Sequence, residues 1–205
     1  MQNMTLSQMM RLSIAMPVLF ALSALVLGQA LERLYAFWIV HRLPEALWQR
    51  VRAALEEGDV SSALNACRHE PGLLARAFTH LLSLSNPSTE RLVEIFQLYR
   101  QRFHLDLSRR VGIFGTASFI APLIGLMGTV LGIMRAFHDL SAAGTGGPTV
   151  VAAGISEALV TTAAGIAVAV VSAVLYNYFT LTARRRMAIL DLWILELALL
   201  RCEIK

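Results

Sequence analysis

One acidic residue, Glu157, lies inside a long apolar run, where a carboxylate is costly. The run covers residues 150–176, and about 20 apolar residues are enough to cross a bilayer. Seven residues of this run precede Glu157, which places it roughly 10 Å from the start of the run at a rise of 1.5 Å per residue. Ionisable residues in membrane spans usually face a bundle interior or an aqueous path and carry ions or protons. The alternative is a glutamate that bends toward the headgroups, but glutamate is short and does this less well than lysine or arginine. We therefore expect Glu157 to be a proton-carrying residue.

The composition favours a membrane protein over a soluble enzyme. Hydrophobic residues make up 56% of the 205 residues and charged residues 16%, whereas a soluble domain carries about 25% charged residues. Cys67 and Cys202 fit no metal-binding or disulfide spacing, and the five histidines are scattered. We find no nucleophile–base pair in the sequence. We therefore expect no catalytic residues, no metal, no cofactor and no enzymatic activity.

The first apolar segment covers residues 12–32 and predicts a first membrane span. Gly28-Gln-Ala30 loosely resembles a signal-peptide cleavage site, which is the alternative. The segment is, however, about 20 residues long, and the apolar core of a signal peptide has 7–15. It continues into Tyr35 and Trp38, aromatic residues typical of a membrane interface. We therefore expect an uncleaved span.

Residues 33–110 are charged, show a helical pattern and contain no long apolar run. Proline, glycine and capping signals predict short helices over 44–57, 59–69 and 73–84. Asn86-Pro87 is typical of a helix cap followed by a first-turn proline. The helix that starts there is expected to continue without a break into the apolar sequence after residue 110. We interpret the region as a helical scaffold beside the membrane.

The second expected span, residues 111–137, contains small residues at helical spacing. Gly125, Thr129 and Gly132 share one helix face, and Gly128 and Gly132 form another close pair. Such spacing lets membrane helices approach backbone to backbone. Thr129 is equally well explained as a packing residue or as a hydroxyl on a polar path. The residues expected to pack helices or line a pore are Pro122, Gly125, Gly128, Gly132, Gly154, Ala158 and Gly165.

The distribution of basic residues predicts the orientation in the membrane. Residues 33–110 contain eleven arginines, and residues 180–205 contain four arginines and Lys205. Cytoplasmic segments carry an excess of Lys and Arg, so both regions are expected inside and the N-terminus outside. The apolar stripe of the tail is expected to pack on the helices of 44–110. This predicts an all-α integral membrane protein with three transmembrane helices, N-terminus out and C-terminus in, whose long helices extend into a cytoplasmic helical domain. The expected segments are an outer N-terminus (1–11), span 1 (12–32), a cytoplasmic helical domain (33–110), span 2 (111–137), an outer loop (138–149), span 3 (150–179) and a cytoplasmic C-terminal helix (180–205).

Two ordered motifs resemble a known family. They are residues 126–134 (LMGTVLGIM), and residues 151–165 (VAAGISEALVTTAAG) followed by Tyr176-Asn177. This pattern resembles the MotA/TolQ/ExbB proton-channel family, most closely its ExbB branch and next its TolQ branch. The likeness is dense over residues 110–180 and weaker before them.

The resemblance implies a multi-pass protein of the bacterial inner membrane that forms a homopentamer. Its second and third spans would surround the single-span helices of a partner like ExbD or TolR, and proton motive force would drive a protein like TonB or TolA. Membrane lipids are the other expected partner, and nucleic acid is not expected. The family pattern places Glu157, Thr162 and Thr129 on the proton pathway. Ideal helix geometry instead favours Thr161, about 40° from Glu157, over Thr162 at about 140°, so both remain candidates.

The function implied is a proton-channel subunit that energises a TonB-type partner for outer-membrane uptake. A TolQ-type subunit that drives TolA for envelope integrity is one alternative. A non-conducting membrane scaffold, in which Glu157 pairs with a basic group on a partner, is another. A secondary transporter is disfavoured because the chain shows none of the inverted repeats such folds carry.

Overall fold

Every element that the structure describes is a helix. A computed structural model describes residues 15–40, 43–85, 87–143 and 148–203. The helices in chain order are α2 (Ala15–Tyr35), the π-helical turn η1 (Ala36–Val40), α3 (Glu45–Glu56), α4 (Val60–Arg68), α5 (Leu73–Leu82), α6 (Thr89–Ser108), α7 (Gly112–Ala143) and α8 (Pro148–Glu203). The expected outer segment 1–11 and the part of the expected outer loop at 144–147 lie outside the described residues.

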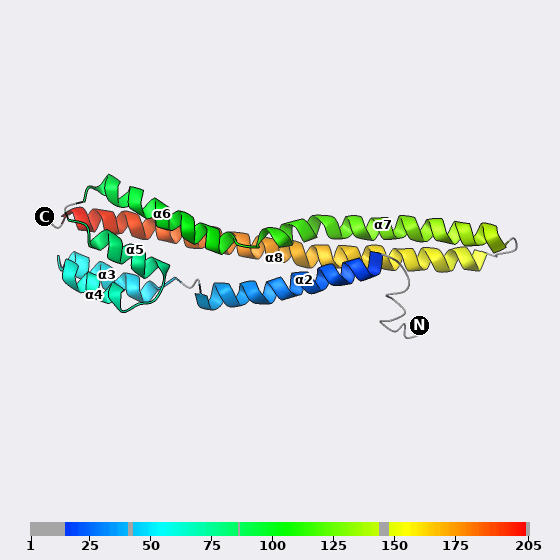
Figure 1. Cartoon of the computed structure of the whole chain (residues 1–205), viewed down its shortest axis with the longest axis horizontal. Coiled ribbons are helices and arrows are strands. Elements are labelled where there is room, and N and C mark those ends of the chain that lie inside the picture. Colours follow the sequence, from blue (N-terminus) through cyan, green and yellow to red (C-terminus); the bar gives the residue numbers. More distant parts are fainter. Residues whose placement is uncertain (1–14, 41–42, 86, 144–147, 204–205) are drawn as a thin grey trace. The chain divides into compact units, whose positions relative to one another are not determined.

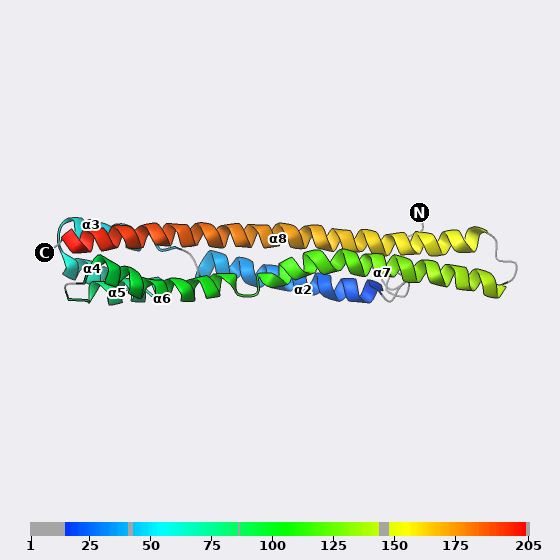
Figure 2. The ribbon, with the colours of Figure 1, turned by 90° about the horizontal axis from the view of Figure 1, so that it is seen from above.

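The chain divides into two compact units, and α8 contributes to both (Figure 1). The first unit contains α2, α7 and α8 up to Phe179, while the second contains η1, α3 to α6 and α8 from Thr180 onward. Helix α8 is a single uninterrupted helix of 56 residues (Figure 2). One continuous helix therefore links an apolar unit with a charged one.

Among the residues that the structure describes, three helical stretches are long and apolar enough to cross a membrane. They are Ala15–Ile39, a stretch within Thr89–Ser141 and a stretch within Val151–Cys202. In the first unit, large apolar side chains such as Phe119, Met134 and Leu159 are exposed rather than buried. An exposed apolar surface of this kind suits contact with lipid or with other membrane helices. The prediction of an all-α fold with three long apolar helices is confirmed.

The first unit is held together by a small apolar core in which α2, α7 and α8 meet. Leu19, Ala121 and Ala169 are buried against one another, one from each helix. Closer to the start of α7, the ring of Phe114 stacks on Phe179 of α8 with their centroids 5.4 Å apart. These contacts fix α7 alongside α8, and the two helices run side by side in both views (Figures 1 and 2).

The second unit is organised around two stacked tryptophans. The ring of Trp48 on α3 lies 5.4 Å from that of Trp193 on α8, at an angle of 12°, and also packs on Phe78 of α5. Arg100 of α6 forms a bidentate ion pair with Asp191 of α8, at 2.6 and 3.0 Å, and this pair raises the pKa of Arg100 further above its ordinary value. The prediction that the C-terminal tail packs on the preceding short helices is confirmed.

Two predictions about α6 are wrong. Its N-cap is Ser88, whose hydroxyl accepts a hydrogen bond from the backbone N–H of Arg91, rather than Asn86 followed by a first-turn proline. The helix also fails to continue into α7, because it ends at Ser108 and Arg110 adopts a positive φ of 59°. A left-handed conformation is unfavourable for arginine. Here the Arg110 guanidinium lies 3.6 Å from the Glu32 carboxylate at the end of α2, an ion pair that favours the break.

Replacing Trp193 with alanine is expected to destabilise the second unit by about 3–5 kcal/mol, the usual cost of removing a buried aromatic residue. The matched control is the neighbouring Leu192→Ala, whose side chain is 65% exposed and whose loss should cost less than about 0.5 kcal/mol. Thermal unfolding of the detergent-solubilised chain, followed by the near-ultraviolet circular dichroism of its tryptophans, measures both. An unchanged unfolding temperature in Trp193→Ala would contradict the stacked core.

Candidate functional site

Helices α7 and α8 touch backbone to backbone along a seam of small residues. A Cβ placed on Gly165 would lie 2.6 Å from the carbonyl oxygen of Ala121 and 3.0 Å from the Cα of Gly125. A Cβ placed on Gly125 would in turn lie 3.0 Å from the carbonyl oxygen of Thr161. A side chain at either position would push against backbone atoms of the other helix, so the glycines determine how closely the helices approach.

The seam continues toward the C-terminal end of α7 and the N-terminal end of α8, where the helices remain close. A Cβ on Gly132 would lie 2.9 Å from the Cβ of Ala158, and a Cβ on Gly154 would lie 2.6 Å from that of Ala136. Gly128 faces two helices, since its Cβ would meet Thr161 Oγ1 at 2.6 Å and the Cβ of Ala15 on α2 at 2.9 Å. The structure therefore brings Gly125, Gly128, Gly132, Gly154, Ala158 and Gly165 together in one seam.

Pro122 lies inside α7, in the same region of the helix as this seam. Proline carries no backbone N–H, so the carbonyl one turn earlier, that of Ser118, loses its usual intrahelical donor. The side chain of Pro122 is half-buried. Its neighbour Ala121 supplies the carbonyl oxygen that lies nearest to Gly165.

The three candidate threonines occupy different environments. Thr161 is fully buried in the seam, and its hydroxyl donates to the carbonyl of Ala158 at 2.7 Å. Thr162 is half-buried and donates across the seam to the carbonyl of Gly125 at 3.1 Å. The hydroxyl of Thr129 donates to Leu126 on its own helix at 2.6 Å. Both α8 threonines thus lie at the seam, while Thr129 satisfies its hydroxyl within α7.

Glu157 flanks the part of the seam in which residues 154–158 of α8 meet residues 132–136 of α7. Its side chain is half-buried, and Arg135 on α7 is the charged group that acts on it electrostatically. Within the described part of the chain, the Glu157 carboxylate has no hydrogen-bond or ion-pair partner. A carboxylate with neither fixed partner nor full burial can bind and release a proton, which is the chemistry that this arrangement allows.

A charged cluster at the end of α2 was not expected from the sequence. Arg33 is 4% exposed, and its guanidinium donates to both oxygens of Glu32 at 2.6 and 3.1 Å. Glu32 also pairs with Arg110 at 3.6 Å. The Glu32–Arg33 pair could have been noticed in the sequence, because the two residues are adjacent. The pairing of Arg110 with Glu32 could not, because these residues are far apart in the chain. The cluster ties the start of α7 to the end of α2.

Metal chemistry has no ligand set among the residues that the structure describes. No group of three or more His, Cys, Asp or Glu side chains in residues 15–40, 43–85, 87–143 and 148–203 could hold an ion.

Three membrane-length helices and a carboxylate beside a small-residue seam define a helical membrane protein. Comparison with protein families matches residues 66–191 to the MotA/TolQ/ExbB proton channel family, and this chain belongs to that family. The resemblance seen in the sequence is therefore confirmed. Because the family consists of channel and transport subunits, the chain is not an enzyme.

Individual relatives carry two kinds of name. The chain is 32% identical over 178 residues to biopolymer transport protein ExbB-like 1 of Synechocystis, covering 84% of this chain and 69% of the relative. It is 30% identical over 181 residues to ExbB-like 3 of the same organism, covering 87% and 85%. The Tol-Pal system protein TolQ of Haemophilus influenzae is 44% identical over 76 residues, covering 37% and 33%. The chain is thus similar to both ExbB and TolQ proteins.

Proposed function

We propose that this chain is the proton-channel subunit of a bacterial inner-membrane complex that uses proton motive force to energise a TonB-type partner for outer-membrane uptake. The observation that carries the proposal is Glu157, a half-buried carboxylate on a membrane-length helix, without a hydrogen-bond or ion-pair partner in the described residues. Such a group is costly in a membrane unless it serves an ion or proton pathway. Membership of a proton channel family supports the same function.

Glu157, Thr162 and Thr129 are the residues that we assign to the proton pathway. Each of the three is partly exposed in the single chain, so each has surface that water or a partner helix can reach. Thr161 is fully buried between α7 and α8, which supports a packing role for it. Ideal helix geometry alone favoured Thr161 as the pathway residue. The different burial of the two neighbouring threonines instead favours Thr162.

The complex that we propose is a homopentamer around one or more single-span helices of an ExbD- or TolR-like partner. The exposed apolar side chains of α7 and α8, among them Met134 and Leu159, leave surface for neighbouring subunits and for that partner. We place the N-terminus outside and the basic second unit in the cytoplasm, following the positive-inside rule. The expected spans 12–32, 111–137 and 150–179 remain our proposal for the membrane-embedded segments.

Two alternatives have specific support. The similarity to TolQ supports a subunit that drives a TolA-type protein for envelope integrity. The electrostatic action of Arg135 on Glu157 supports a scaffold in which the carboxylate is a counter-ion and never releases a proton. The ExbB names of several relatives favour the TonB-type function.

Deleting the chain from its native host is expected to abolish growth on iron bound to a siderophore, while growth on a freely diffusing iron source and resistance to detergent remain normal. The reason is that only uptake through energised outer-membrane transporters needs the TonB-type output. A protonophore applied to the intact strain should stop the same uptake. Detergent sensitivity with normal siderophore use would instead identify the TolA-type function, and uptake that persists with the protonophore would favour the scaffold.

A further inference from the structure

Arg135 lies near the expected outer end of span 2 (111–137), where an arginine is unusual. Basic residues gather on the cytoplasmic side of membrane proteins, and this one is expected on the other side. Its side chain is exposed and has no hydrogen-bond or ion-pair partner in the described part of the chain. A long side chain at a helix end can extend to the headgroups, but the position of Arg135 relative to Glu157 indicates a more specific role.

Arg135 and Glu157 lie on the same side of the α7–α8 seam. The two helices are antiparallel, since the seam contacts run backward along α8 as they run forward along α7. On each helix the charged residue comes three positions after a seam glycine and directly before a seam alanine, Ala136 on α7 and Ala158 on α8. At 100° per residue, each side chain is rotated about 80° from the middle of the seam. In an antiparallel pair, equal rotations bring both side chains to the same side.

This arrangement agrees with the electrostatic action of Arg135 on Glu157. The two side chains nevertheless form no ion pair or hydrogen bond with each other. A bidentate arginine would tie up both carboxylate oxygens, whereas an arginine that acts only through space leaves them free to bind a proton. Arg135 therefore influences the ionisation of Glu157 without occupying the atoms that take up the proton.

The other ionisable groups on the packed helices lie elsewhere or are paired. Helix α2 carries its ionisable residues in its last turn. On α7, His138 and Asp139 are exposed and pair with each other at 3.5 Å. Within α8, Glu157 is the one ionisable residue before Tyr176. Among the described residues, Arg135 is thus the charged group that acts on this carboxylate.

We propose that Arg135 is a positioning residue of the proton pathway, whose fixed positive charge makes Glu157 release its proton rather than retain it. The proposal rests on the proton-channel function proposed above. Apolar surroundings favour the neutral form of a carboxyl, and a nearby positive charge favours the ionised form. Arginine itself stays protonated. The proton therefore passes from the outer water to the Glu157 carboxylate and on to the inner water, and Arg135 neither accepts nor donates it.

The test is proton flux into liposomes that hold the purified complex, measured over a range of pH at a fixed pH difference across the membrane. Flux requires both uptake and release of the proton, so it is greatest near the pH at which the carrying group is half protonated. In Arg135→Gln the pH of maximal flux is expected to rise by about one unit, because the carboxyl keeps its proton to higher pH once the positive charge is gone. Arg135→Lys keeps the charge and should keep the wild-type pH of maximal flux.

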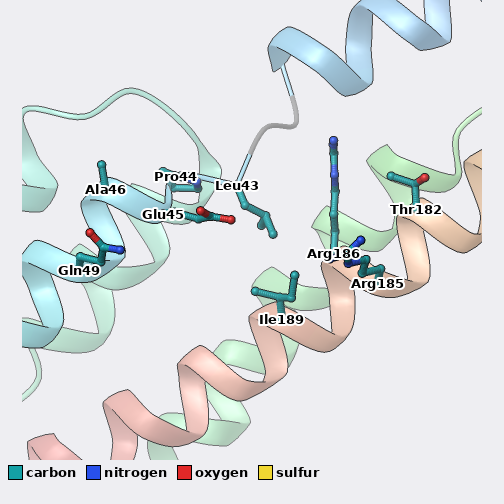
Figure 3. Close-up of a pocket in the computed structure, with 9 residues that line it drawn as sticks. All are labelled: Leu43, Pro44, Glu45, Ala46, Gln49, Thr182, Arg185, Arg186 and Ile189. Atoms are coloured by element: carbon teal, nitrogen blue, oxygen red, sulfur yellow. The ribbon is translucent and has the colours of Figure 1, made fainter.

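The matched control is Arg185→Gln, which removes the same charge from a part of the chain that does not contain Glu157. Arg185 lines an open cavity of about 790 Å³ in the second unit (Figure 3). Its side chain is exposed and has no hydrogen-bond or ion-pair partner among the described residues. The pH of maximal flux in this variant is expected to equal that of the wild type.

An unchanged pH of maximal flux in Arg135→Gln would overturn the proposal, and so would flux that is absent at every pH from the assembled variant. A shift of the same size in Arg135→Lys or in Arg185→Gln would also overturn it, because the effect would then not come from a charge beside Glu157. Assembly is followed by native gel electrophoresis. If Arg135→Gln does not assemble, Arg135→Met replaces it, and failure of both would assign Arg135 a structural role instead.

The proposed function fails by different results, namely no flux in the wild type or wild-type flux in Glu157→Gln. A chain that conducts protons through Glu157, but whose pH of maximal flux is the same in Arg135→Gln, would contradict the role of Arg135 alone.

Discussion

Replacing Glu157 with glutamine is expected to leave the complex assembled and to abolish every proton-driven output. Glutamine has nearly the same size and shape as glutamate, but it cannot bind or release a proton. The Glu157 carboxylate has no hydrogen-bond or ion-pair partner in the described part of the chain, so the exchange breaks no such contact there. Function should therefore be lost without a loss of packing.

Two quantities are measured. The first is proton flux into liposomes that hold the purified complex, and the second is siderophore-dependent growth of cells that express the variant. Both are expected to fall to the level of a strain or vesicle without the chain. Glu196→Gln is the matched control, because it also neutralises a carboxylate on α8. The Glu196 carboxylate pairs with Arg52 in the second unit. Wild-type flux in Glu157→Gln would refute the proton role.

A shorter acid at the same position separates the proton pathway from the scaffold. In Glu157→Asp the carboxylate remains but moves back toward the helix by one methylene, which alters the distances that proton transfer requires. We expect reduced flux with normal assembly. If the aspartate variant is fully active and its activity persists in the presence of a protonophore, the result would favour a Glu157 carboxylate that serves as a counter-ion to Arg135 or to a basic group on a partner.

The magnitude of the membrane potential makes such a proton step feasible. Moving one charge across 100 mV supplies about 2.3 kcal/mol. Placing a charged residue such as aspartate at a helix centre costs about 2.5–3.5 kcal/mol on insertion scales. The two energies are comparable, so a carboxyl that is partly reached by water can be protonated on one side and discharged on the other. A fully lipid-exposed carboxyl would not meet this condition.

Signals that act within a few residues predicted the short helices well. Pro44 and Gly58 bracket α3, and Asp59 caps α4 by accepting hydrogen bonds from the backbone of Ser61 and Ser62. The long apolar runs likewise predicted the membrane-length helices, because the length and composition of a segment are local properties of the sequence. The misplaced cap of α6 shows the limit, since Ser88 and Asn86 are both good caps and the sequence alone does not choose between them.

Contacts between distant residues could not be predicted. The break at Arg110 accompanies an ion pair with Glu32, and the order of the second unit depends on the pairs Trp48–Trp193 and Arg100–Asp191. In each case the partner lies far along the chain and no local pattern marks it. The different burial of Thr161 and Thr162 had the same origin, because it depends on where α7 packs rather than on the 100° step between residues.

Replacing Gly165 with alanine is expected to destabilise the α7–α8 pair, although alanine is the better helix former. Alanine gains up to about 1 kcal/mol over glycine in a helix interior. Against this gain, the new Cβ would lie 2.6 Å from the Ala121 carbonyl oxygen and 3.0 Å from the Gly125 Cα, both of which are backbone atoms. Overpacking costs about 1–3 kcal/mol when neighbours must shift, and here the backbone itself must move. The clash therefore outweighs the gain, and Gly165→Leu should be worse.

Gly28→Ala provides the opposite case, because a Cβ on this α2 glycine would have nothing within 4 Å. This variant keeps the gain in helix propensity and pays no steric cost, so it should be as stable as the wild type or slightly more stable. Thermal unfolding of the detergent-solubilised complex, with its size followed by native gel electrophoresis, compares the variants. Equal stability of Gly165→Ala and Gly28→Ala would mean that α7 and α8 lie farther apart at Gly165 than the seam requires. A lower unfolding temperature in Gly165→Ala alone would show that the close approach of these backbones holds the segment that carries Glu157 in place.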